Sequence, residues 1–575
     1  MKNMMKKLIS ILVFVLCMLC SGNLMAAEIQ VAVPLNGSST VDMYFSILSV
    51  DESTHTGTVS VGRSDRRAVM MGQAVINKST AGSIEIPAEI SDNGYVYTVV
   101  EIGQNAFIGC AGITSISIPE GVTQTGKSAF NQCSGLHTIS IPASLKVLGA
   151  STFSECSNLT SVTFATGSVL ESIGSGCFYK CEKMTEISLP ASVTNIDGAF
   201  SYCTGLTSIE VPVGVTTVGG ATFAECINLE TIHFQGNITS IGTTAFYNCV
   251  KLSSVNLPNQ VTEIGRYAFY NCSSIANLKV PEGMTDIGDY AFAGCSGLTR
   301  IYIGPTVTSI GEGAFSDCTA TMKVIFDNCM PKIAFNSFEN CSKDDKLYFP
   351  TRYYEVISGH ALLSEMNLYP YMTIANEYNT FAMDAKLDIT NVKVLDTEYE
   401  ETDATDFHTY VCKNFDKETR NVSVDEITGV LPAREGMLVK GTQGTKYLLK
   451  ISKDEATADV AGNLLRGVIT NTKIGGPSSL DYVLVDGIFY RASAGMLGAG
   501  KCYLHLPSNT SAGARLNPFN LDILTTGIED TFESAVSSKG LIYDLNGKVV
   551  GSGLEMLKQL PQGIYIYNNR KYMNK

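Results

Sequence analysis

The first residues to consider for chemistry are the cysteines, of which this chain of 575 residues has 17. In an exported protein, cysteines form disulfides, ligate metals or pack as small apolar side chains. Most of these cysteines recur at a regular spacing, and the side chains of neighbouring members of such a series would be held parallel, which is an unsuitable geometry for a disulfide. A series with an odd number of cysteines also cannot pair completely. No histidine series runs beside them, so we predict free, packed thiols and no metal or other cofactor. Eleven cysteines form one such series, each three residues after a phenylalanine: Phe107/Cys110, Phe130/Cys133, Phe153/Cys156, Phe178/Cys181, Phe200/Cys203, Phe223/Cys226, Phe246/Cys249, Phe269/Cys272, Phe292/Cys295, Phe315/Cys318 and Phe338/Cys341. Cys177 and Cys329 lie outside the series and receive no role.

The remaining candidates for catalysis do not form a recognisable constellation. HExxH and GxSxG motifs are absent from the sequence. Frequent carboxylates in the second half do not amount to a paired acid and base. We therefore predict that the chain is not an enzyme. The six histidines are scattered over its whole length: His55, His137, His233, His360, His408 and His505.

One acidic run offers oxygen ligands at close spacing, which suits calcium. It lacks the glycine and the regular alternation of an EF-hand loop. The alternative is a solvated acidic loop, which we favour, and the sequence leaves the calcium interpretation open. The run comprises Asp396, Glu398, Glu400, Glu401, Asp403 and Asp406.

The elements that position the cysteine series recur with a period of 23 residues. Eight of the ten intervals between its cysteines are 23 residues, one is 25 and one is 22. In the copy from Cys203 to Cys226, Leu206, Ile209 and Val211 alternate as a short inward-facing strand. A turn and a short helical stretch then return the chain to Phe223. Because no copy can bury its apolar side alone, a fixed period of this length predicts stacked coils of a solenoid.

The pattern AFxxCxxLxxIxIPxxVxxIG resembles the leucine-rich repeat of BspA-like surface proteins of Bacteroidetes, over roughly residues 83–350. The resemblance implies a leucine-rich-repeat solenoid, with a β-strand and a short helix or turn per coil. Some copies depart from the pattern: Thr125 replaces the usual Ile, Asp197 replaces the Gly, and the third strand ends in Phe164 without Pro. These departures weaken single coils only.

The two ends of the chain predict export. Lys2, Lys6 and Lys7 precede an apolar run and the small residues before Ala27, as in a secretory signal peptide. Near the other end, YDLNGKVV and LPQGIYIY resemble the C-terminal sorting domains of type IX secretion cargo. The alternative for this end is a small β-module that signals nothing. The net charge of −14 argues against nucleic acid or an anionic membrane as a partner, and no later stretch is apolar enough to span a bilayer.

The predicted organisation therefore has six parts, and the chain beyond the repeats is expected to be all-β. Alternating strands separated by Gly, Asn and Asp turns support that expectation. The parts are a signal peptide (1–26), a β-rich N-terminal cap (27–82), the solenoid (83–351), a helical cap or linker (352–373), a β-sandwich-like domain (374–523) and a sorting-like domain (524–575).

The surface most suited to binding is the strand face of the solenoid. The two residues that flank the second apolar position of each strand point outward. They change from Ser and Thr in the first coils, such as Ser115 and Ser117, to basic and aromatic residues in the last. Lys, Arg and Tyr together suit carboxylate, sulfate or an acidic protein surface. The predicted binding residues are Asn277, Lys279, Arg300, Tyr302, Lys323, Lys346 and Tyr348, with Ile325 between them on the same face.

These features predict an exported binding protein at the cell surface or in the medium, without catalytic residues. The resemblance implies adhesion, with a host protein, an extracellular-matrix component or a glycan as the partner. The alternative is a glycan-handling accessory protein or hydrolase that uses residues 374–523 as a carbohydrate-binding module. The chain has no tryptophan, so an aromatic platform for a sugar would have to be Tyr or Phe.

Overall fold

The computed structural model describes residues 28–468 except 38, 64–70, 328, 376–377, 398, 416–421, 453–456, 459 and 462, and short segments between 472 and 574. The predicted signal peptide lies outside the described residues. The chain divides into two compact units, 1–323 with 329–345 and 324–328 with 346–575.

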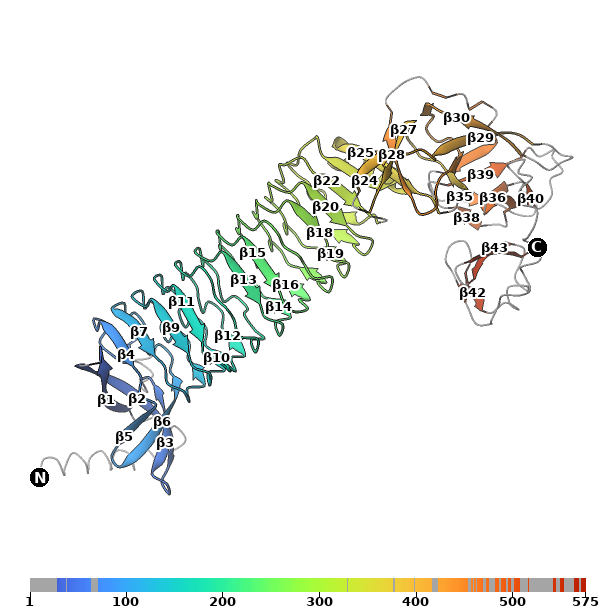
Figure 1. The fold of residues 1–575 in the computed structure, drawn as a ribbon. Helices are drawn as coiled ribbons and strands as arrows, with labels where there is room; N and C mark the ends of the chain where they lie inside the picture. The colour runs from blue at the N-terminus through green and yellow to red at the C-terminus, as the bar shows by residue number, and fades with distance from the viewer. Residues whose placement is uncertain are drawn as a thin grey trace, which may run out of the picture. The chain divides into compact units, whose positions relative to one another are not determined.

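The first unit is a β-solenoid, as predicted, in which successive coils stack in register (Figure 1). One side carries the longer strands, which form the strand face, and a second side carries two-residue strands. Both sides are parallel ladders with a register of one coil, for example Ser115 with Thr138. The strand face contains β4 (Gly82–Glu85), β7 (Ile113–Ser117), β9 (Thr138–Ile141), β11 (Ser161–Phe164), β13 (Ser208–Val211), β15 (Thr231–Phe234), β18 (Asn277–Lys279) and β20 (Arg300–Ile303). The second side contains β6 (Tyr95–Ile102), β8 (Gln124–Thr125), β10 (Val147–Leu148), β12 (Ser172–Ile173), β14 (Thr217–Val218), β16 (Ser240–Ile241), β17 (Glu263–Ile264), β19 (Asp286–Ile287), β21 (Ser309–Ile310) and β23 (Lys332–Ile333).

Strands at the N-terminal end cover the first coil. β1 (Glu28–Leu35), β2 (Ser39–Asp51) and β3 (Thr56–Val61) form an antiparallel meander, and β5 (Glu89–Asp92) pairs with β6. β1 pairs with β4 of the strand face, and β3 pairs with β6 of the second side. The meander therefore joins both ladders, and it shields apolar surface that the end of a solenoid would otherwise expose.

The Phe and Cys series form two columns in the interior. Ten successive pairs of Phe rings are stacked, with centroids 4.9–5.7 Å apart and ring planes within 19° of parallel. The cysteines are free, as predicted, and among those described only Cys341 is not fully buried. From Cys133 onward, each thiol of the series donates to the carbonyl of the Phe in the preceding coil at 3.0–3.4 Å. A thiol is small enough for this column and also supplies a weak donor to a buried carbonyl.

The segment around each Phe is a turn, and the short helical stretch that the sequence predicts is absent from the described coils. Residues two before and two after the Phe adopt left-handed backbone conformations, as at Ser128 (φ 58°) and Gln132 (φ 61°). These residues rotate alternate peptide groups toward the next coil. Phe130 N–H therefore donates to Thr152 O at 2.8 Å, where a helix would bond within its own coil. Backbone hydrogen bonds consequently join the coils on this third side as well.

The left-handed position after Phe explains the repeated AFYNC. Asn adopts this conformation more readily than most residues other than Gly, and the sequence places Asn248 and Asn271 there at φ 57°. Their side chains also form a ladder between coils. Asn271 Nδ2 donates to Asn248 Oδ1 at 2.9 Å, and Asn248 Nδ2 donates to Glu225 Oε1 at 2.8 Å. The Asn is therefore a structural residue of the turn.

The second unit begins with β24 (Lys346–Pro350), and it corrects the helical cap expected over 352–373. The helical part is limited to η1 (Thr351–Tyr353), α3 (Tyr354–Ser358) and η2 (Leu363–Glu365). β25 (Asn367–Thr373) follows and pairs in parallel with β24. Ile357 and Leu363 are buried, but Leu368 to Met372 continue the ladder. Among the described helices none is long and apolar enough to cross a bilayer.

In the rest of the second unit, the described residues form β-strands and turns. Two sheets share an apolar core that contains Phe381, Val411, Met437, Tyr447 and Leu449. The strands are β26 (Tyr378–Phe381), β27 (Leu387–Leu395), β28 (Glu401–Asp403), β29 (His408–Phe415), β30 (Val422–Ile427), β31 (Val430–Leu431), β32 (Met437–Lys440), β33 (Lys446–Ile451), β34 (Leu465–Val468), β35 (Thr472–Ile474), β36 (Asp481–Val485), β37 (Ile488–Arg491), β38 (Gly495–Leu497), β39 (Lys501–His505) and β40 (Arg515–Leu516). A separate four-stranded sheet ends the chain, with β41 (Leu541–Tyr543), β42 (Val549–Ser552), β43 (Gly563–Tyr567) and β44 (Arg570–Asn574). β22 (Lys323–Phe326) begins in the first unit and continues in the second.

Candidate binding surface on the solenoid

The strand face presents the side chains that the alternation predicts. Ser117, Ser140, Thr163, Glu210 and His233 are all exposed. The intervening apolar residues are buried, since β9 and β13 both alternate exposed and buried positions. The parallel register places equivalent side chains of successive coils beside one another. The face is therefore a continuous row of outward side chains wherever the ladder is paired.

At the C-terminal end of the first unit, this face becomes basic and aromatic, as predicted. Asn277 is opposite Arg300, and Lys279 is opposite Tyr302, on β18 and β20. Lys279 Nζ lies 6.0 Å from the centroid of the Tyr302 ring and 3.9 Å from Glu282 Oε1. Asn277 and Lys279 are exposed, and Arg300 and Tyr302 are partly exposed.

Lys323 belongs to the same group of side chains. Its backbone N–H donates to Thr299 O at 2.8 Å, which places it on the coil that follows β20. The Lys323 side chain is partly exposed. We call Asn277, Lys279, Arg300, Tyr302 and Lys323 the basic patch.

The last two predicted residues belong to the second unit, and one of them is not accessible. Tyr348 is fully buried, because Tyr369 of β25 stacks on its ring at 5.1 Å and its hydroxyl donates to Glu401 Oε1 at 2.7 Å. Burial and that carboxylate raise the pKa of Tyr348 well above its usual range. Ile325 is buried too. Lys346 is partly exposed, with Nζ 5.3 Å from the Tyr369 ring centroid. The prediction of an exposed Tyr348 is therefore wrong.

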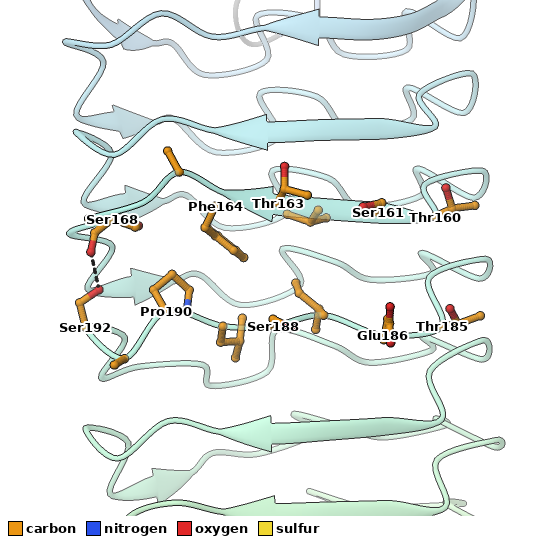
Figure 2. A pocket seen from close by; sticks show the side chains of 16 residues that line it. Thr160, Ser161, Thr163, Phe164, Ser168, Thr185, Glu186, Ser188, Pro190 and Ser192 are labelled. Atoms are coloured by element: carbon orange, nitrogen blue, oxygen red, sulfur yellow. Dashed lines mark hydrogen bonds between the residues drawn. The ribbon is translucent and has the colours of Figure 1, made fainter.

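The strand face is interrupted after β11. Residues 185–189 of the next coil form no strand, and the ladder resumes at β13. Figure 2 shows the resulting cleft, of about 650 Å³, between β11 and residues 185–192. The interruption coincides with the two irregular repeat intervals, 25 residues from Cys156 to Cys181 and 22 from Cys181 to Cys203. The strand face is interrupted again at residues 255–257, between β15 and β18, where the repeat interval is a regular 23 residues, so an irregular interval is not required for the loss of strand pairing.

The acidic run does not gather into one site. Glu401 accepts from Tyr348, Asp403 pairs with Lys393, and Asp406 accepts from Tyr447 at 2.7 Å. Glu398 lies outside the described residues. In the part of the chain that the structure describes, no group of three His, Cys, Asp or Glu side chains is arranged to hold a metal ion.

A cluster of tyrosines lies on the side of the solenoid that carries the turns around each Phe, and it was not predicted from the sequence. The Tyr247 and Tyr270 rings stack at 5.0 Å, and the Tyr267 and Tyr290 rings stack at 5.1 Å. The Arg266 guanidinium carbon lies 4.9 Å from the Tyr267 centroid, which is within cation–π range. The available signal was the recurrence of Tyr at two positions of neighbouring repeats, directly after Phe and two residues before it.

The off-series cysteines also have structural positions. Cys177 directly precedes Phe178 and is fully buried. It occupies the column that holds Ala129, Thr152 and Ala199 in other coils, so a small side chain is what the position requires. Cys329 is buried, and its Sγ lies 3.5 Å from Ile303 O.

Stacked 23-residue coils with inward Phe and Cys columns define a leucine-rich-repeat-type β-solenoid. The BspA type leucine rich repeat family matches residues 89–198, 197–321 and 262–385, which together span more than half of the chain. The chain therefore belongs to this family.

Solved structures of similar proteins are also found. A leucine-rich repeat protein from Bacteroides ovatus is 25% identical, with 56% of this chain and 97% of that one covered and a TM-score of 0.28. A leucine rich cell surface protein from Faecalibacterium prausnitzii is 26% identical, with 54% and 98% covered and a TM-score of 0.27. The pneumococcal vaccine antigen PcpA is 20% identical, with 58% and 96% covered and a TM-score of 0.33. No curated protein matches the chain.

Proposed function

We propose that this chain is an exported surface protein that binds a host protein, an extracellular-matrix component or a glycan through the strand face of its solenoid. The single observation that supports the proposal most is the basic patch. It places Lys279, Arg300 and Lys323 on neighbouring coils, on one open face, in a chain of net charge −14. A partner with carboxylate or sulfate groups would complement this patch.

Export and surface retention form the second part of the proposal. The N-terminal leader would direct secretion, and the C-terminal sheet of β41–β44 would act as a sorting domain. Membership of a family of surface proteins supports this view. Labelling of intact cells with an antibody to the repeats tests it, because surface exposure gives a signal without permeabilisation. A signal that requires permeabilised cells contradicts it.

Charge reversal tests the basic patch. The variant Lys279→Glu/Arg300→Glu/Lys323→Glu of the full chain is expected to bind immobilised matrix proteins or acidic glycans at least about ten-fold more weakly. The reason is that like charges would replace attractive ones at the centre of the contact. Binding of the unaltered chain and of the triple variant would be measured by surface plasmon resonance at physiological salt, because salt screens contacts between exposed charges.

A matched variant controls for net charge. Lys127→Glu/Lys183→Glu/Lys251→Glu makes the same total change at exposed residues outside the strand face. It is expected to bind within about two-fold of the unaltered chain, since rim and remote charges contribute little to affinity. Equal losses in the two triple variants, or no loss in either, would remove the basic patch from the binding surface.

A further inference from the structure

The cleft between β11 and residues 185–192 is a second candidate site on the strand face, far along the chain from the basic patch. Figure 2 shows hydroxyl groups along both walls and the Phe164 side chain directed from β11 toward the coil of Pro190. Its volume of about 650 Å³ is in the range of small-molecule sites.

Phe164 gives the cleft an aromatic surface. At Ile141 and Val211 the equivalent position is a buried aliphatic residue followed by Pro, whereas Phe234 of β15 is a partly buried Phe without Pro after it, like Phe164. Phe164 is followed by Ala165 and is only partly buried. A phenyl ring is larger than either aliphatic side chain, and here it occupies space between two coils. It therefore offers part of its ring to a ligand in the cleft.

The opposite wall offers unpaired backbone groups. Within the described residues, the backbone N–H groups of Glu186 and Ser188 donate to no carbonyl of β11, although this is where a regular coil would pair. Such donors must be satisfied by water or by a ligand. A ligand with several hydroxyl oxygens can replace that water without loss of hydrogen bonds.

The side chains select the charge of the ligand. The walls carry the hydroxyls of Ser161, Thr163, Thr185 and Ser188 and the carboxylate of Glu186. No Lys or Arg lines the cleft, so an anion would meet Glu186 without a compensating charge. The hydroxyls can donate and accept hydrogen bonds, and the carboxylate can accept them, so both suit the hydroxyl groups of a neutral ligand.

We propose that this cleft binds a neutral saccharide unit of one or two rings. The apolar C–H face of a pyranose would lie against Phe164, and Glu186 would accept hydrogen bonds from its hydroxyl groups. The unpaired N–H groups of residues 186 and 188 would donate to its oxygens. The proposal concerns residues separate from the basic patch, so either site can fail without the other.

Calorimetric titration of the full chain tests the proposal. The probes are neutral disaccharides built from glucose, galactose, mannose or N-acetylglucosamine, with a uronic-acid disaccharide as the charged comparison. We expect at least one neutral probe to bind and the uronic-acid probe to bind more weakly. Phe164→Leu should weaken binding of the neutral probe about ten-fold because an aromatic contact is lost. Glu186→Gln should weaken it by a similar factor because hydrogen bonds to a charged group are lost.

Glu210→Gln is the matched control, because Glu210 is an exposed strand-face glutamate on β13, outside the cleft. It should leave the affinity within about two-fold. Glu186→Gln changes one exposed side chain, so its fold can be verified by circular dichroism before titration. The proposal is overturned if none of the neutral probes binds, if the uronic-acid probe binds more tightly, or if both cleft variants bind as well as the control.

Discussion

Replacing Phe246 by alanine is expected to lower the free energy of unfolding of the solenoid by about 3–5 kcal/mol. Phe246 is fully buried, and its ring stacks on those of Phe223 at 5.4 Å and Phe269 at 4.9 Å. Alanine would leave a cavity in the middle of the column. Because coils are stabilised by their nearest neighbours, the loss would reach the coils on both sides.

Urea unfolding of the full chain, followed by circular dichroism, measures this effect. Phe335→Ala is the matched control, because Phe335 lies in the last coil of the series but is 75% exposed. Its substitution should change the free energy of unfolding by no more than about 0.5 kcal/mol. Similar midpoints for the two variants would mean that the Phe column contributes little to stability.

Gly242→Ala is expected to destabilise the solenoid by about 1–3 kcal/mol through overpacking. A Cβ atom at Gly242 would lie 2.7 Å from Gly220 N and 2.8 Å from Gly219 C, which are backbone atoms of the preceding coil. Gly242 does not have a positive φ, so the backbone conformation itself permits alanine. The cost is therefore a direct measure of how closely the coils stack.

Gly304→Ala is the control for Gly242→Ala, because it replaces a glycine at a position where the backbones of two coils do not approach closely. A Cβ there would meet only Tyr302 Cε1, at an ordinary 3.7 Å. The substitution should be neutral or slightly stabilising, because alanine restricts the unfolded chain. Thermal unfolding of both variants provides the comparison. An equal fall in Tm for the two would contradict tight stacking at Gly242.

The solenoid could be predicted from the sequence because every copy of the repeat shows the same need to bury its apolar side against a neighbouring copy. Eleven Phe/Cys pairs at nearly constant spacing require like residues to stack on like, whatever the details of one coil. The outward direction of Ser117, Lys279 and Glu210 followed from strand alternation alone. The free state of the thiols followed from the parallel positions of neighbouring coils.

The features that were missed depend on contacts between elements far apart in the sequence or on backbone conformation. Tyr348 is buried because Tyr369 and Glu401 cover it, and alternation within β24 contains no such information. The segment predicted as a short helix is a turn because Ser128 and Gln132 have positive φ. Neither Ser nor Gln is a residue type that indicates a positive φ in the sequence. Phe164 stood out only as a departure from the repeat, and the cleft beside it required coordinates.

The most direct test of the stacked interior is the reactivity of its thiols. Burial raises the pKa of the Cys156, Cys226 and Cys295 thiols to about 12, so almost none is ionised at pH 8, and a thiolate is the reactive form. The folded chain should be labelled slowly by iodoacetamide, with Cys341 modified first because it alone among the described cysteines is only partly buried. In denaturant, all fifteen of the cysteines found free in the structure should react. Peptide mass spectrometry gives the labelling of each residue. Rapid modification of the Phe-x-x-Cys series in the folded chain, or disulfides between its members, would contradict a continuous interior of stacked coils.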